Sequence, residues 1–495
     1  MQRNNQRQRN RLLLIAALAV VTIGAHLLTQ RSIAIPTIPT SDGLDFAAPG
    51  GSSVAFSGKL DRHAVLAGGD GQVKMELVLA AENRPAKTKR IPTDFVIVLD
   101  RSGSMNGEKI EQARAAVREL ISQLAVGDRF ALVSYSSGAA VSIPLSEATA
   151  EARQHWRQVV ASIQPGGGTN MSDGLDLALE ITQGTGFGRA TRWILISDGL
   201  ANQGDASVEG LSARARRAAG REAVVSTVGV GADFNEFLMS QVADAGTGNY
   251  YYLEDVAQLA QVFSDEFSAS RETVATAVAV SIAPGDGVRV IDAAGYPLEH
   301  VAGKTIFRPG SLFAGQERRI WVTLAVPNEA AGEHSLGDFA LHYKDPTQSN
   351  RGLTRIVEFT DTPIVASVLD ETTYHDSFDR ETWARSVAEE DYNALQQRVA
   401  SHVRQGRRDE AKQEIDDFRT HNARLNQVMQ QEAIQEKLEE LQRLHTDVDD
   451  AFQGQNQLHK QKTLSKTRQY SGWEGRRAGS KKAPSIDKNA GKGGA

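Results

Sequence analysis

The stretch FVIVLDRSGS at residues 95–104 decides the fold of the central part of the chain. An apolar run is followed at once by an Asp-x-Ser-x-Ser cluster that begins at Asp100. A short apolar run without polar alternation is typical of a strand that is buried on both faces of a parallel sheet. Loops at the carboxyl ends of such strands form the ligand crevice of α/β sheets. The stretch therefore predicts a central strand that ends in a candidate binding loop.

Strands and helices are expected to alternate on both sides of this stretch. After the first strand, further strands are expected at 129–136, 192–197, 223–231 and 249–254, with helices at 108–124, 150–163, 172–182, 208–217, 235–245 and up to residue 270. Apolar strands joined by crossover helices imply a mostly parallel sheet with helices on both faces. Residues 92–270 are therefore expected to form a doubly wound α/β domain.

The flanking segments have a different character, as expected for a chain of 495 residues that is long enough for several domains. Residues 52–91 alternate apolar and polar side chains, which predicts a β-hairpin, and residues 271–365 show strand patterns between Gly and Pro turns. A sheet made only of the few strands in residues 52–91 would be marginally stable by itself. We therefore expect these two segments to pair in a β-sandwich into which the α/β domain is inserted. Residues 366–453 carry apolar side chains at helical spacing, interrupted at Gly406, which predicts an antiparallel helical pair or coiled coil.

Candidate metal-binding residues occur in three separate loops. Asp100, Ser102 and Ser104 follow the first strand, Thr169 lies in the segment Gly-Gly-Gly-Thr-Asn that precedes a helix, and Asp198 ends the strand at 192–197. Taken one at a time, such residues are equally typical of helix caps and turns. Their combination favours a binding site.

The combination resembles the von Willebrand factor type A family, whose metal-ion-dependent adhesion site joins Asp-x-Ser-x-Ser, a loop threonine and a loop aspartate in this order. All five positions are matched, and the segments at 126–130 and 243–246 are also similar to the family. A comparable order, with β-rich segments flanking the domain, occurs in several groups of the family. These are bacterial secreted or membrane-anchored members, inter-alpha-trypsin inhibitor heavy chains and calcium-activated chloride channel regulators.

The resemblance implies one divalent cation, Mg²⁺ or alternatively Mn²⁺ or Ca²⁺. It implies that Ser102 and Ser104 bind the ion directly, that Thr169 binds directly or through water, and that Asp100 and Asp198 act mainly through waters. Mg²⁺ prefers hard oxygen ligands in octahedral geometry and keeps several waters. The implied function is adhesion or assembly, in which an exposed Asp or Glu of a partner protein completes the coordination of the ion.

An enzyme is a less favoured alternative, because the chain has no cysteine nucleophile and His155 is the only histidine in residues 92–270. A metal-dependent hydrolase would have to use Asp100 or Asp198 as base or nucleophile. A third alternative is an assembly scaffold that acts through the helices near residues 380–450. We therefore expect a binding protein that is not an enzyme.

The N-terminal segment, residues 1–34, carries four arginines before the apolar run Leu12 to Leu28, and no acidic residue precedes Asp42. This charge pattern predicts a single-pass membrane anchor with the bulk of the chain outside the cytoplasm. Cleavage of the segment as a signal peptide, which would make the protein secreted, stays an alternative. Residues 35–51, with three prolines, are expected to be a linker.

Residues 454–495 contain ten lysines and arginines against two acidic residues. Such a basic, Gly- and Ser-rich tail is typical of a disordered segment that contacts anionic polymers or lipids. It has few aromatic residues for stacking on bases, so no nucleic acid partner is expected. The alternative is a tail that folds back on the acidic body of the same chain.

Overall fold

The computed structural model describes residues 45–83, 91–184, 189–346 and 353–477. Its α/β domain contains a six-stranded sheet in the order β10-β9-β8-β5-β6-β7. The strands are β5 (Thr93–Asp100), β6 (Arg129–Tyr135), β7 (Ala139–Glu147), β8 (Ala190–Ser197), β9 (Ala223–Val230) and β10 (Thr247–Leu253). Only β7 runs antiparallel to its neighbour within this sheet. All eight residues of β5 are buried, as its unbroken apolar run predicts.

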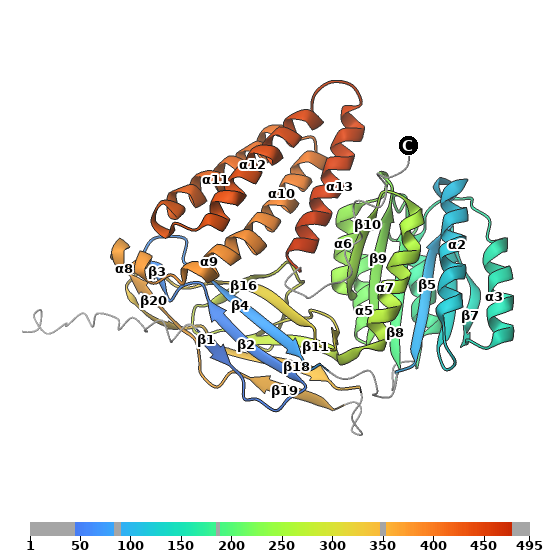
Figure 1. Cartoon of the computed structure of the whole chain (residues 1–495), viewed down its shortest axis with the longest axis horizontal. Coiled ribbons are helices and arrows are strands. Elements are labelled where there is room, and N and C mark those ends of the chain that lie inside the picture. Colours follow the sequence, from blue (N-terminus) through green and yellow to red (C-terminus); the bar gives the residue numbers. More distant parts are fainter. Residues whose placement is uncertain (1–44, 84–90, 185–188, 347–352, 478–495) are drawn as a thin grey trace, which may run out of the picture. The chain divides into compact units, whose positions relative to one another are not determined.

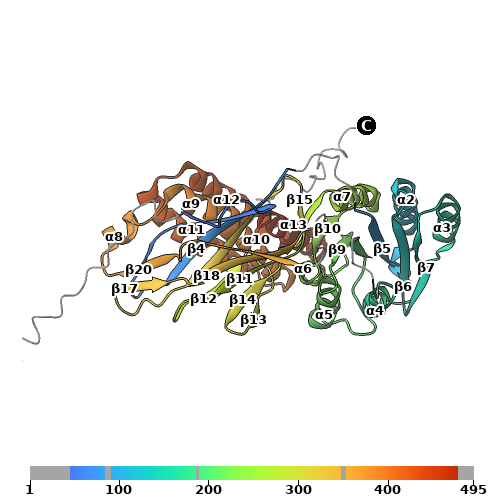
Figure 2. The same cartoon turned by 90° about the horizontal axis from the view of Figure 1, so that it is seen from below.

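Helices cover both faces of this sheet, which confirms the predicted α/β fold class (Figure 2). One face packs on α2 (Glu108–Gln123), α3 (Ala150–Ser162) and α7 (Leu259–Arg271), and the other on α4 (Met171–Ile181), α5 (Val208–Ala219) and α6 (Glu236–Ala245). Side chains of β5 alternate between two separate cores, because successive residues of a strand point to opposite faces. The central strand is thereby fixed from both sides, and its carboxyl end is held in place.

The segments before and after the α/β domain share one sheet. Nine residue pairs join β4 (Gln72–Ala81) to β16 (Glu317–Ala325) in an antiparallel ladder, although more than 200 residues separate them in sequence. This sheet has the order β1-β2-β4-β16-β12, and a second sheet has the order β13-β14-β11-β18-β19. One hydrophobic core contains residues of both sheets. The α/β domain is thus inserted between two halves of a β-sandwich (Figure 1).

The remaining sandwich elements complete these sheets or form a small third one. Besides β4 and β16, the strands of the two large sheets are β1 (Asp45–Ala47), β2 (Val54–Leu60), β11 (Thr273–Ala283), β12 (Arg289–Ala293), β13 (Glu299–Val301), β14 (Lys304–Phe307), β18 (Asp338–Lys344) and β19 (Thr354–Glu358). Strand β15 (Leu312–Phe313) also pairs with β11. A three-stranded sheet joins β17 (Gly332–Ser335), β20 (Ile364–Val368) and β3 (Ala64–Leu66).

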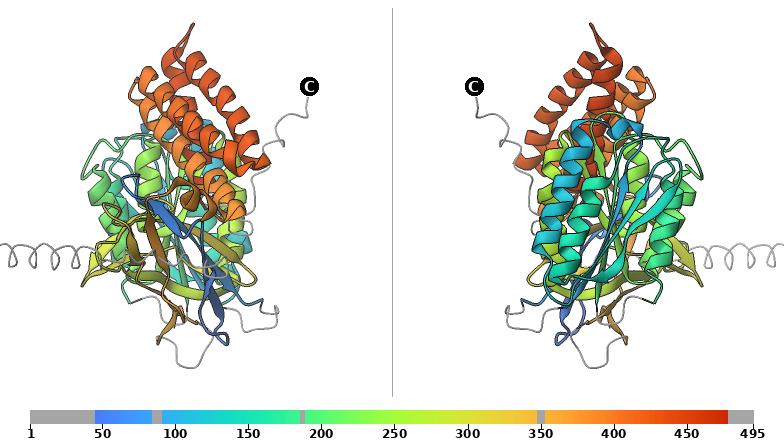
Figure 3. Two further views of the ribbon diagram at one scale, coloured as in Figure 1. Left: turned by 90° about the vertical axis from the view of Figure 1, so that its left-hand side faces the viewer. Right: turned by 90° about the vertical axis from the view of Figure 1, so that its right-hand side faces the viewer.

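The C-terminal region is helical, as predicted. Two short helices, α8 (Glu371–Asp376) and α9 (Arg380–Arg385), lead through a π-helical turn at Ser386–Asp391 into α10 (Tyr392–Arg404), α11 (Arg408–Met429) and α12 (Glu432–Ala451). A shared apolar core joins these helices. Figures 1 and 3 show α10, α11, α12 and the following helix α13 (Gln457–Gly475) side by side. Gly406, with φ of +73°, lies between α10 and α11, where the sequence indicates a break.

The prediction of a disordered tail from Gly454 is wrong for its first part, because residues Gln457–Gly475 form the helix α13. Acidic residues elsewhere in the chain neutralise this basic segment, so that it is held in place instead of repelling itself. Lys466 and Arg477 pair with Glu236 and Asp244 of α6. Residues 478–495 lie outside the described part, so the proposed contact with anionic polymers or lipids gains no support.

The predicted single-pass membrane location is corrected as well. Within residues 45–83, 91–184, 189–346 and 353–477, no helix is both long and apolar enough to cross a bilayer. The helices of the structure are amphipathic or polar because one face packs on a sheet or on a neighbouring helix. The apolar run Leu12 to Leu28, on which the prediction rested, lies outside the described residues.

Candidate metal centre

Asp100 is the last residue of β5 and is fully buried. One of its carboxylate oxygens, Oδ1, accepts a hydrogen bond of 2.8 Å from the backbone N–H of Ser102. The other, Oδ2, accepts one of 2.8 Å from the hydroxyl of Ser197 at the end of β8. Asp100 therefore fixes the loop that follows it and ties that loop to the neighbouring strand.

Ser102, Ser104 and Asp198 continue this line of contacts. The hydroxyl oxygens of Ser102 and Ser104 are 3.0 Å apart. The Ser104 hydroxyl donates a hydrogen bond of 2.7 Å to Oδ1 of Asp198. Ser102 and Asp198 are buried while Ser104, between them in this series, is exposed, so the group reaches the surface at Ser104.

Thr169 comes from a different loop that is bound to the first by backbone hydrogen bonds. The N–H of Gly103 donates to the carbonyl of Gly167 at 3.0 Å, and the N–H of Thr169 donates to the side chain of Asn202 at 2.9 Å. A Cβ atom added at Gly199 would lie 3.2 Å from the Ser104 hydroxyl oxygen and 3.9 Å from that of Thr169. Thr169 and Ser104 thus approach the same backbone position, and all five residues lie at one edge of the sheet.

The electrostatics of this edge favour a cation. Burial raises the pKa of Asp100, against hydrogen bonds from Ser102 and Ser197, and the charge of Asp198 raises it further. A carboxylate whose charge is destabilised by burial and by a second carboxylate gains from any positive charge nearby.

Two residues of this edge were missed in the sequence. Lys109, in the first turn of α2, forms an ion pair of 2.5 Å with Oδ2 of Asp198, and Ser197 binds Asp100. Ser197 directly precedes Asp198, but its type is too common in turns to single it out. Lys109 lies five residues beyond Ser104, and nothing in that spacing indicates contact with a residue near position 200.

The side chains present suit a hard, oxygen-loving cation. Within the residues described, no group of three or more His, Asp or Glu could hold a metal, so a site here must use hydroxyl oxygens besides its two carboxylates. Mg²⁺ takes octahedral oxygen ligands at about 2.0–2.1 Å, which places neighbouring ligands about 2.9 Å apart. The 3.0 Å between the Ser102 and Ser104 hydroxyl oxygens agrees with such an edge.

Comparison with known proteins identifies the α/β domain. The family profile of the von Willebrand factor type A domain matches residues 94–265. YfbK of Escherichia coli (strain K12), described as uncharacterized, is 28% identical over 200 residues, which are 40% of this chain and 34% of that protein. Inter-alpha-trypsin inhibitor heavy chain H4 of Bos taurus is 29% identical over 166 residues, 32% of this chain and 18% of that protein. The matched regions therefore span about a third or less of these relatives.

A solved von Willebrand factor type A protein from Catenulispora acidiphila has a similar fold, with a TM-score of 0.59 and 20% identity over 77% of this chain and 91% of that chain. Domains of this type typically mediate protein interaction and adhesion. The sheet order, the helices on both faces and the family match agree with one another. Residues 94–265 therefore form a von Willebrand factor type A domain.

Proposed function

We propose that Asp100, Ser102, Ser104, Thr169 and Asp198 hold one divalent cation, best suited to Mg²⁺, through which the protein binds a partner. Ser102 and Ser104 donate their hydroxyl oxygens directly, and Thr169 binds directly or through water. Asp100 and Asp198 act through waters and hydrogen bonds. The observation that carries the proposal is a series of contacts: the Ser102 backbone N–H donates to Asp100, the Ser102 and Ser104 hydroxyls are in contact, and the Ser104 hydroxyl donates to Asp198.

The hydrogen bonds support this division of roles. Both oxygens of Asp100 already accept hydrogen bonds from Ser102 and Ser197, which suits a carboxylate that orients the inner ligands. Ser104 donates its proton to Asp198, which leaves an oxygen lone pair free for a cation. With neutral hydroxyls nearest, the bound ion keeps much of its charge.

An ion with this ligand set attracts a further anionic ligand. An Asp or Glu side chain exposed on a partner protein has the hard oxygen and the charge that Mg²⁺ prefers. Ser104 is exposed, so the ion would lie where a partner can reach it. The proposed function is therefore cation-dependent binding of a protein through an acidic side chain, without an enzymatic reaction.

Calorimetric titration of the full chain with Mg²⁺ and Mn²⁺ tests the proposal. We expect saturable binding to one site and its loss in Asp100→Ala and Ser102→Ala, while Glu180→Gln, at an exposed position of α4, leaves it unchanged. Circular dichroism of each variant checks that the domain is folded. Absence of cation binding in a folded chain, or equal binding by all variants, would contradict the metal site.

The partner's role needs a second measurement on the same variants. A peptide library with a single Asp or Glu at its centre is tested for binding in Mg²⁺ and in EDTA. We expect binding that requires Mg²⁺ and is lost when the acid is replaced by Asn or Gln. Binding in EDTA would show that recognition does not pass through the ion.

A further inference from the structure

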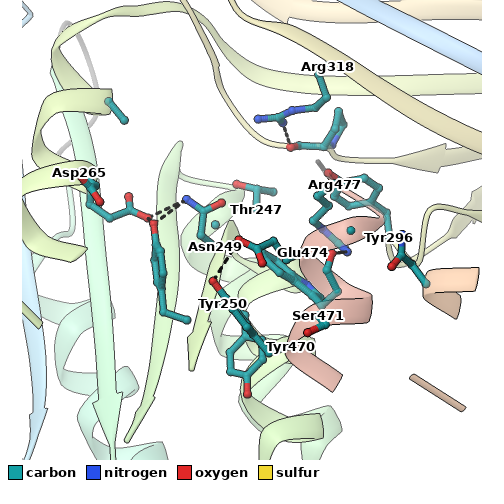
Figure 4. Close-up of a pocket in the computed structure, with 18 of the residues that line it drawn as sticks. Thr247, Asn249, Tyr250, Asp265, Tyr296, Arg318, Tyr470, Ser471, Glu474 and Arg477 are labelled. Carbon is teal, nitrogen blue, oxygen red and sulfur yellow. Dashed lines mark hydrogen bonds between the residues drawn. The ribbon is translucent and has the colours of Figure 1, made fainter. Parts of the chain in front are cut away.

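A cavity of about 600 Å³ lies where the von Willebrand factor type A domain, the β-sandwich and α13 meet. Asn249 from β10, Arg318 from β16, and Tyr470 and Arg477 from α13 and the turn after it contribute to its walls (Figure 4). The cavity contacts the amino end of β10, whereas Asp100 lies at the carboxyl end of the parallel strand β5. It is therefore separate from the proposed metal site, at the opposite edge of the sheet. Its size is in the range of pockets that hold small organic molecules.

Arg318 carries a positive charge that the cavity does not neutralise. Its guanidinium donates hydrogen bonds to the backbone carbonyls of Pro309 and Ser311, and no carboxylate among the described residues forms an ion pair with it. Burial lowers the pKa of Arg318 despite the opposing effect of Tyr296, and the positive charges of Arg477 and Arg192 lower it further. A partly buried guanidinium near two other cations is stabilised by an anion.

Each acidic residue that lines the cavity already has a partner, although Asp265 and Glu474 have only hydrogen bonds, from Gln261 and Tyr470, and no ion pair among the described residues. Glu266 forms an ion pair with Arg192 and accepts hydrogen bonds from Ser226, Asn249 and Tyr251. Glu440 pairs with Lys437 at 2.9 Å. The other lining cations are likewise engaged, since Arg477 pairs with Asp244 and Arg468 with Asp447. Arg318 is thus the lining cation whose charge is left for a ligand.

Aromatic rings form one part of the wall. Tyr250 makes edge contacts with Tyr470 and Trp473, with ring centroids 5.8 and 5.9 Å apart. The guanidinium of Arg477 lies 4.4 Å from the ring centre of Tyr296. Such rings favour a planar, apolar ligand, because edge and face contacts add to the burial of apolar surface. Many polar and charged side chains also line the cavity, and polar groups at fixed positions orient a bound molecule.

We propose that this cavity binds a small organic anion with a planar ring, whose carboxylate or phosphate pairs with Arg318 while its ring packs among Tyr250, Tyr470 and Trp473. Because the walls come from three parts of the fold, the ligand contacts all three at once. The proposal does not depend on the metal site.

The test is a calorimetric titration of the full chain in EDTA, so that no divalent cation can bind the probe. Benzoate carries both a carboxylate and an aromatic ring, whereas acetate lacks the ring and benzamide lacks the negative charge. We expect saturable benzoate binding with a Kd below about 10 mM, and at least about tenfold weaker binding of acetate and benzamide.

Variants locate the site. Arg318→Gln should weaken benzoate binding by about tenfold or more, since a hydrogen-bonded ion pair is lost, while Arg318→Lys keeps the charge and part of the affinity. Arg289→Gln, at an exposed position of the same sandwich, should bind as the unaltered chain does. Thermal melting confirms that each variant is folded. Absence of benzoate binding to the unaltered chain, or equal binding by a folded Arg318→Gln, would overturn the proposal.

Discussion

The ammonium of Lys109 lies 2.5 Å from Oδ2 of Asp198, while Oδ1 of the same carboxylate accepts the hydroxyl proton of Ser104. Asp198 is fully buried, and the Lys109 side chain is 37% exposed. A partly exposed positive charge therefore contacts one of the five residues proposed to hold the cation. Lys109 and a divalent ion compete for the same negative charge, because both are stabilised by it and repel each other.

Replacing Lys109 by Met removes this competitor, so the affinity for Mg²⁺ should rise by about three- to tenfold. Calorimetric titration at fixed ionic strength measures the change. Lys304→Met, at an exposed position of β14, is the matched control and should leave the affinity unaltered. Weaker Mg²⁺ binding by Lys109→Met would instead indicate that the lysine supports the site.

Lys466 of α13 and Glu236 of α6 form an ion pair of 3.1 Å, with only 4% of either side chain exposed. Lys466→Met leaves the Glu236 carboxylate buried without its cation and should lower the free energy of unfolding by about 3–5 kcal/mol. The double variant Lys466→Met with Glu236→Gln should recover part of this loss, because no buried charge remains.

Unfolding in guanidinium chloride gives the free energy of unfolding of the unaltered chain, of Lys466→Met and of the double variant. Lys462→Met is the control, since its ion pair with Asp233 is exposed and should contribute no more than about 1 kcal/mol. If the double variant is no more stable than Lys466→Met, the cost does not come from the unpaired charge.

Asp128 stabilises the structure around residues 126–130, one of the two segments that resemble the family. Its carboxylate accepts hydrogen bonds of 2.9 Å from the backbone N–H groups of Thr93 and Ala125, and it is fully buried. Asp128→Ala leaves both groups unsatisfied and should cost about 1–3 kcal/mol for each. Asp128→Asn keeps one acceptor and should cost less. Urea unfolding gives the ranking, and equal stability of the two variants would contradict this role.

His63 gives the protein a predictable dependence on pH. Burial lowers the pKa of its imidazole, and neither ring nitrogen has a hydrogen-bond partner among the described residues. The unfolded chain therefore binds a proton more readily than the folded chain as the pH falls through the ordinary pKa of about 6.5. The stability that the neutral imidazole provides is present above that pH and is lost below it.

His63→Phe should consequently lose less stability than the unaltered chain between pH 7.5 and pH 5. Thermal melts across this range give the comparison, and the exposed His421→Asn serves as control. Parallel pH profiles for the unaltered chain and His63→Phe would show that the imidazole does not control this loss.

The sequence alone determined the α/β domain and the residues proposed to bind the cation. Local patterns carried this information: the apolar run that ends at Asp100 specifies a doubly buried strand, and the carboxyl ends of parallel strands lie at one edge of the sheet. The resemblance to the von Willebrand factor type A family then grouped Asp100, Ser102, Ser104, Thr169 and Asp198 without coordinates. The structure adds the hydrogen bonds that join Asp100 to Ser102 and Ser104 to Asp198, and the contact between the two serine hydroxyls.

Only the tertiary structure decided which charged residues from distant segments pair with one another. The basic residues of α13 predict a disordered tail when they are considered by themselves, but Glu236 and Asp244, more than 200 positions earlier, neutralise Lys466 and Arg477. Lys109 likewise pairs with Asp198, and Arg318 has no carboxylate partner among the described residues. No local spacing in the sequence indicates either result. Periodicity reports which face of an element is buried, whereas the identity of the partner across that face depends on the packing of the whole chain.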